Sequence, residues 1–159
     1  QVDILVVTQM KEAFSDDEMA QIKDYLGKGG NMLIAGDPGC QDFMNPLLEE
    51  FGIRFMPGRI MQNNPNFVKN LVLAKPSAEA SKTNGHFRWM NHWNYKAPML
   101  DAVGIDCSEA TSKGVETMTI MDTDNGNWNE QTHTTYIETG TEIEKKDSDF
   151  KTDMMLWLL

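Results

Sequence analysis

The segment formed by residues 2–35 constrains the fold more than any other part of the chain. Val2–Val7 (VDILVV) is a short, continuous apolar run rich in β-branched residues, which predicts a strand buried on both faces, as in a parallel sheet. A second such run, NMLIA, occupies residues 31–35. The residues between them carry a helical pattern. Because a helix that joins two parallel strands forms a right-handed crossover, this segment predicts a β-α-β unit.

The predicted crossover helix carries signals at both of its ends. Ser15 is followed three residues later by Glu18, which is the capping-box pattern of a helix start. Met19, Ile22 and Leu26 then form one apolar stripe. The GKGG segment that follows supplies glycines for the left-handed conformation that ends many helices. The helix is therefore expected to begin after Ser15 and to end at these glycines.

The rest of the chain predicts further strands and a second helix. Asn45-Pro46 has the pattern of an N-cap followed by proline at the first helical position. Residues 62–98 are polar, turn-rich and aromatic, and we expect an irregular insertion there that includes a short strand. Apolar or alternating runs at residues 53–56, 71–74 and 115–121 predict further strands. The threonine- and glutamate-rich stretch 133–146 predicts an exposed strand or loop. The pattern predicts one α/β domain over residues 1–159, with a partly parallel sheet and a β-rich second half.

The charge balance excludes one class of function. Acids outnumber bases 24 to 14, for a net charge of −10. A protein that binds nucleic acid nonspecifically must bring cations to the phosphates, and this chain brings too few. The same negative net charge disfavours binding to anionic lipid.

No apolar run reaches the ~18–20 residues of a membrane span. Since the sequence runs from VDILVV to MMLWLL, we expect a fragment of a membrane-associated protein, whose membrane contact lies in segments outside this chain.

The loop GDPGC, residues 36–40, follows the second predicted strand, where α/β folds often bind ligands. Asp37 and Cys40 are its candidate functional groups. The loop lacks the small-x-nucleophile-x-small pattern of a nucleophile elbow and the lysine of a phosphate loop. A Pro-Gly turn is the favoured interpretation, and a hydrolase with Cys40 as nucleophile stays open as an alternative.

The remaining candidates for metal or thiol chemistry are few. Cys40 and Cys107 are the two cysteines, and we expect free thiols because a domain of this size needs no disulfide. His86 and His92 are six residues apart, which fits neither one helical face nor a zinc motif. We therefore expect no catalytic residue, no metal and no cofactor.

An aromatic cluster provides the other candidate site. Four rings lie within nine residues, and two cations lie among or next to them: Phe87, Trp89, Trp93 and Tyr95, with Arg88 and Lys96. The rings either form a stacking platform for a sugar or a peptide, or fold back over a sheet edge. Their alternation is typical of one face of an irregular strand. Trp128, in NGNWNE, is a further candidate member.

Several of these segments together resemble a known family. The strand VDILVV, the helix SDDEMAQIKDYLGKGG, the strand NMLIAGDP and the segment NPLLEEFGIRFMPGRI are similar to the gliding-motility-associated, GldG-like auxiliary component of ABC-2-type transporters from Bacteroidetes. FRWMNHW and WNEQT fall in the corresponding order. The resemblance covers residues 2–61 closely and 84–159 loosely.

The resemblance implies a fold, a location and partners. It implies a three-layer α/β core, flavodoxin-like or glutamine-amidotransferase-like, in an extracytoplasmic, periplasmic domain. The implied partners are the permease and ATPase of the same transport system, with a saccharide or peptide as ligand. We expect a non-catalytic recognition domain, or else a carbohydrate-binding module that uses the tryptophans. The expected binding residues are Asp37, Cys40 and Asn45 at the sheet edge, with Trp89, Trp93 and Trp128.

Overall fold

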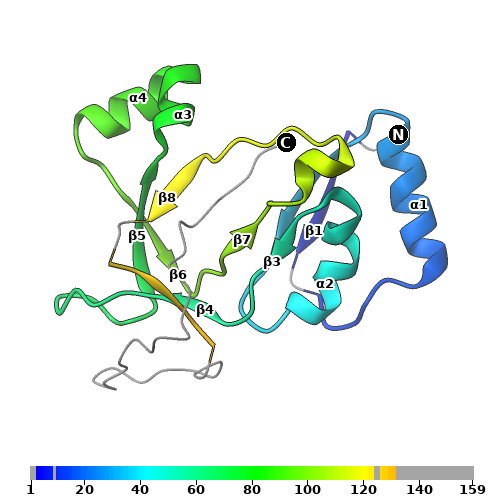
Figure 1. The fold of residues 1–159 in the computed structure, drawn as a ribbon, viewed down its shortest axis with the longest axis horizontal. Helices are drawn as coiled ribbons and strands as arrows, with labels where there is room; N and C mark the ends of the chain where they lie inside the picture. Colours follow the sequence, from blue (N-terminus) through cyan, green and yellow to red (C-terminus); the bar gives the residue numbers. More distant parts are fainter. Residues whose placement is uncertain (1–2, 9, 124–125, 132–159) are drawn as a thin grey trace.

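The computed structural model describes residues 3–8, 10–123 and 126–131 and shows a mixed α/β fold (Figure 1). The helices are α1 (Asp16–Gly27), α2 (Gln41–Leu48), α3 (Ala78–Thr83) and α4 (Gly85–His92), with 3-10 turns η1 (Glu49–Phe51) and η2 (Ala110–Lys113). The strands are β1 (Ile4–Thr8), β2 (Asn31–Ala35), β3 (Arg54–Phe55), β4 (Arg59–Met61), β5 (Leu71–Pro76), β6 (Ala97–Leu100), β7 (Ile105–Asp106), β8 (Met121–Thr123) and β9 (Trp128–Glu130). The predicted α/β class is confirmed.

The β-α-β unit at the start of the chain forms as predicted. β1 pairs with β2 in parallel, with Ile4 opposite Asn31 and Thr8 opposite Ala35. The capping box at the start of α1 is complete, because the Ser15 backbone N–H donates to Glu18 Oε2 at 2.9 Å and the Glu18 N–H donates to Ser15 Oγ at 3.4 Å. The sequence signals at this helix end therefore determine its position.

The burial of the parallel strands differs from the sequence expectation. Val7 is 7% exposed on the inner face, whereas Ile4 and Val6 on the outer face are 58% and 54% exposed. Leu33 of β2 is 40% exposed. The prediction of burial on both faces is wrong for these side chains. Within the described residues the parallel sheet has two strands, and its outer apolar face is open.

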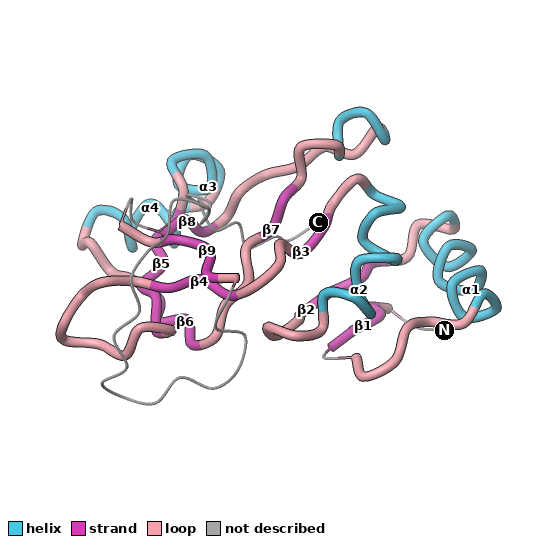
Figure 2. Tube along the Cα trace, turned by 60° about the horizontal axis from the view of Figure 1, so that its bottom comes forward, coloured by secondary structure: helices cyan, strands magenta, loops and turns pink. Residues whose placement is uncertain are grey.

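Two larger apolar cores divide the described structure into two lobes, and a third, smaller cluster joins Met61 to Trp128. In the first, α2, β3 and η2 pack on the inner face of β1, with Val7, Met44 and Phe55 among the buried residues. In the second, the antiparallel sheet β6-β5-β8 packs around Ile60 and Val72. Figure 2 shows β5, β6 and β8 apart from the β1–β2 pair, with β3 and β7 between them. The strands thus form several small sheets, parallel in β1–β2 and antiparallel elsewhere.

Residues 62–98, expected as an irregular insertion, are largely regular. They contain the predicted strand as β5, and also α3 and α4. β5 is the central strand of its sheet, and Val72 and Ala74 on it are fully buried. The segment is therefore an integral part of the second core. The aromatic side chains of this segment lie on α4 and on the turn after it, and not on a strand. The helix begins after Asn84, whose side chain caps it by accepting the His86 N–H at 2.8 Å.

Two other predicted elements shift, and two lie outside the described residues. α2 begins at Gln41, so that Pro46 lies inside the helix and Asn45 is not its N-cap. Of the strand predicted over residues 115–121, only Met121 is part of a strand, the short β8. The predicted element at 133–146 and the apolar end MMLWLL lie outside the described residues.

Candidate functional site

The GDPGC loop at the carboxyl end of β2 forms a turn. The Cys40 N–H donates to the Asp37 carbonyl at 3.2 Å. Gly39 has a φ of 100°, a conformation that glycine adopts without strain. The side chain of Asp37 is exposed. The loop therefore has the backbone geometry of the favoured interpretation, a Pro-Gly turn.

Cys40 has the surroundings of a core residue. Its side chain is 3% exposed and belongs to the first core with Met44 and Phe55. The thiol donates to the Asp37 carbonyl at 2.9 Å, and burial raises the pKa of the Cys40 thiol. An activated nucleophile needs the opposite, a lowered pKa and access. Cys40 and Cys107 are both free thiols in the structure.

Asn45 and Trp128 hold the interior together. The Asn45 side chain accepts the Phe55 N–H at 2.8 Å and donates to the Phe55 carbonyl at 3.0 Å, so it joins α2 to β3. Trp128 is fully buried, and its indole N–H lies 3.3 Å from Glu130 Oε2. This corrects the expectation that Trp128 adds an exposed ring to the aromatic cluster. Its burial is not indicated by the local sequence, because WNE is flanked by polar residues.

Trp89 and Trp93 both lie on the outside of the second lobe, on α4 and at its end. They are 55% and 58% exposed, and Tyr95 is 52% exposed. The ring centroids of Trp89 and Tyr95 are 5.2 Å apart, and those of His92 and Trp93 are 5.1 Å apart. Cys40 and Asn45 belong to the first lobe, whereas α4 lies on the far side of the second (Figure 1). The six predicted residues therefore do not form one site, and ligand binding by Asp37, Trp89 and Trp93 stays a prediction.

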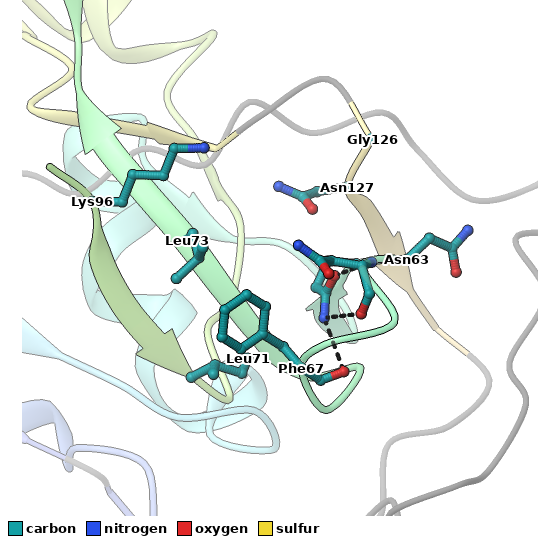
Figure 3. A pocket seen from close by; sticks show the side chains of 9 residues that line it. Asn63, Phe67, Leu71, Leu73, Lys96, Gly126 and Asn127 are labelled. Carbon is teal, nitrogen blue, oxygen red and sulfur yellow. Dashed lines mark hydrogen bonds between the residues drawn. The ribbon is translucent and has the colours of Figure 1, made fainter. Parts of the chain in front are cut away.

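The structure adds a pocket of about 210 Å³ on the outer face of β5. Phe67 lies beside Leu71 and Leu73, and Lys96 and Asn127 lie above them in the view (Figure 3). The lining residues are Gln62, Asn63, Asn64, Phe67, Leu71, Leu73, Lys96, Gly126 and Asn127. They combine an apolar wall, four amide side chains and one ammonium, with no carboxylate among them. This composition suits a polar ligand that is neutral or negatively charged and has an apolar face.

Gln62 fixes the loop that forms one side of this pocket. Its side chain is buried, and its amide nitrogen donates to the Val68 carbonyl at 2.9 Å. Its amide oxygen accepts the Asn64 N–H. The Lys69 ammonium donates to the Asn63 side-chain oxygen at 3.1 Å. These bonds shape the loop before any ligand arrives, which reduces the ordering cost of binding.

Sequence reasoning missed this pocket. In sequence, the segment QNNPNF is only polar and turn-rich. The lining residues come from three separate stretches, 62–73, 96 and 126–127. One signal was available: leucines alternate on β5 at positions 71 and 73, next to an asparagine-rich loop. That signal does not show which face of the strand is open.

The described residues also bear on two other classes of site, metal centres and membrane spans. They contain no group of three or more His, Cys, Asp or Glu side chains placed to hold a metal ion. None of their helices combines the length and apolar character needed to cross a membrane.

The chain matches a known protein family. A family model described as an ABC-type uncharacterized transport system matches residues 1–96. The chain belongs to this family. The family is that of an auxiliary component of ABC-type transport, so the coarser part of the resemblance seen in the sequence is confirmed. No curated protein matches the chain, and no solved structure matches it.

The family match covers part of each lobe, because η2 and β7 of the first lobe lie beyond residue 96. The matched residues include β1 through α4 and all of the pocket lining except Gly126 and Asn127. They also include Trp89 and Trp93, and they end at Lys96 in the pocket wall. Both candidate surfaces, the pocket and the exposed rings, therefore lie mainly within the region that the family shares.

Proposed function

We propose that this auxiliary component is a non-catalytic recognition domain that binds a saccharide in the pocket on the outer face of β5. The observation that supports the proposal is the pocket's composition, in which Phe67, Leu71 and Leu73 form an apolar wall beside amide side chains. Sugar rings present C–H faces and rows of hydroxyl groups. An apolar wall binds the first by burial. Since the Gln62 amide is bonded within its own loop, the asparagine side chains of the lining pair with the second, because an amide group both donates and accepts.

The setting of this domain is part of the same proposal. It resembles the GldG-like group, and on that basis we infer that it faces the periplasm and assembles with the permease and ATPase of an ABC-2-type system. Family membership supports association with a transport system. The pocket would then present a substrate, or a saccharide attached to it, to the permease.

The environment of Cys40 supports a role without catalysis. A buried thiol with a raised pKa holds little thiolate at neutral pH, and the thiolate is the nucleophile. Among the described residues, the pocket lining contains no cysteine, histidine or carboxylate. The described lining thus offers groups that bind and orient a ligand, and none of the carboxyl groups that transfer protons to a glycosidic bond.

Isothermal titration calorimetry with a panel of neutral and acidic saccharides and short peptides tests the proposal. At least one saccharide should bind, and Phe67→Ala should weaken that binding about tenfold or more, because the ring forms part of the apolar wall. Phe67 is already 40% exposed, so its truncation leaves the fold intact. Trp89→Ala is the matched control: it removes an exposed ring that does not line the pocket.

Binding of peptides alone would assign the pocket to peptide recognition and refute the saccharide proposal. Equal loss of binding in Phe67→Ala and Trp89→Ala would also refute it, since the site would then lie elsewhere. The carbohydrate-binding alternative based on the tryptophans predicts the reverse order, in which Trp89→Ala has the larger effect.

A further inference from the structure

α4 and the turn after it present an aromatic face, which we define as Trp89, Trp93 and Tyr95. All three side chains are more than half exposed. Large rings are costly to leave in water, and a contiguous set of them on a surface marks a contact site. The ring centroids of Trp89 and Tyr95 are 5.2 Å apart, and Trp93 follows Trp89 by four residues at the end of the same helix, which puts it on the same side of α4. These rings lie outside the pocket lining.

The orientation of this face is fixed by bonds on the opposite side of the helix. Phe87 packs against the second core, and the Asn91 side chain donates to the Pro76 carbonyl at 2.9 Å. At the end of the helix Asn94 adopts a left-handed φ of 54°. The Tyr95 N–H then donates to the Met90 carbonyl at 2.9 Å, which turns the chain back and sets the Tyr95 ring against Trp89.

The charge around the aromatic face is opposite to that of the whole protein. Residues 79–100 contain three cations, Lys82, Arg88 and Lys96, and one acid, Glu79 on the neighbouring helix α3, whereas the chain as a whole has a net charge of −10. Charges in solution are screened over about 8–10 Å at physiological ionic strength. A surface that approaches α4 therefore responds mainly to the local cations, and the overall negative charge opposes it only weakly.

We propose that the aromatic face lies in the headgroup layer of an anionic phospholipid membrane. Indole and phenol rings partition to this layer because they have an apolar body and a polar edge, and neighbouring lysine and arginine side chains are attracted to the lipid phosphates. An ABC-type transport system works in a membrane, so this surface is available to its auxiliary component. The proposal replaces the sequence expectation that membrane contact lies only in segments outside this chain.

Vesicle flotation with the 159-residue chain tests the proposal. The chain should float with vesicles of phosphatidylcholine and phosphatidylglycerol, less with phosphatidylcholine alone, and less at high salt. The double variant Trp89→Ala/Trp93→Ala should lose at least tenfold in binding. Because both rings are more than half exposed, this variant should keep its fold, which circular dichroism verifies. Lys82→Gln should weaken binding about fivefold, as one surface charge is worth about that factor.

Two control variants keep the test specific. Ile4→Ala removes an apolar side chain of similar exposure, 58%, from the first lobe, and Lys113→Gln removes an exposed cation away from α4. Both should float like the original chain. The absence of flotation, or equal flotation of the double tryptophan variant, would overturn the proposal. Binding to the reconstituted permease without binding to lipid vesicles would also overturn it and would assign the face to a protein partner.

Discussion

Two adjacent valines of β1 offer a sharp test of the fold. Val6 and Val7 are the same residue type in the same strand, but Val6 is 54% exposed and Val7 is 7% exposed. Each is replaced by alanine. The loss of β-propensity is nearly the same at the two positions, because both lie within one strand of one sheet. The difference between the two variants therefore measures the burial of each side chain.

The expected magnitudes follow from these exposures. Valine to alanine removes two carbon groups, worth about 1.6 kcal/mol of transfer free energy when fully buried. At Val7 a cavity among Met44 and Phe55 adds to this, for a total of about 2–3 kcal/mol. At Val6 about half of the transfer free energy remains and no cavity forms, so the expected cost is about 0.5–0.8 kcal/mol. The two variants should differ by about 2 kcal/mol in the free energy of unfolding.

Urea denaturation followed by circular dichroism measures this difference. With a slope of about 2 kcal/mol per molar urea for a domain of this size, the midpoint of Val7→Ala should lie about 1 M below that of Val6→Ala. Equal midpoints would refute the reasoning. They would mean that the outer face of β1 and β2, with Ile4 and Leu33, is covered in solution.

Two other predictions concern titratable groups. In a Cys107→Ser variant, Cys40 should react with a thiol reagent about a thousandfold slower in the native chain than in the unfolded one, because reaction requires the first core to open; rapid labelling of native Cys40 would revive the hydrolase alternative. The pKa of Asp106 is lowered, first by the Ser108 backbone N–H and then by Arg54, so its carboxylate stabilises the fold above the ordinary aspartate pKa, and this contribution is lost as the pH falls through the lowered value. Thermal melts between about pH 2 and 5 should therefore show a shallower acid dependence for Asp106→Asn than for the exposed-site control Asp3→Asn.

The sequence by itself determined the parts of this protein that depend on neighbours along the chain. The capping box at Ser15, the parallel pairing of β1 with β2 and the turn at Gly39 were all predicted and are all present. Each depends on hydrogen bonds or conformational preferences within a few residues, or on the short crossover between two apolar runs. The family itself was also recognisable from these local patterns, in its coarser form.

Only the tertiary structure decided which side chains are buried and which residues meet. Val6 and Val7 cannot be distinguished by their residue type or local pattern, and neither can Trp93 and Trp128. Val7 and Trp128 are nevertheless buried, whereas Val6 and Trp93 are exposed. The pocket joins residues more than fifty positions apart. The physical reason is that burial and site formation depend on which elements pack against each other. That choice is made by the summed apolar contacts of the whole chain, which no local pattern contains.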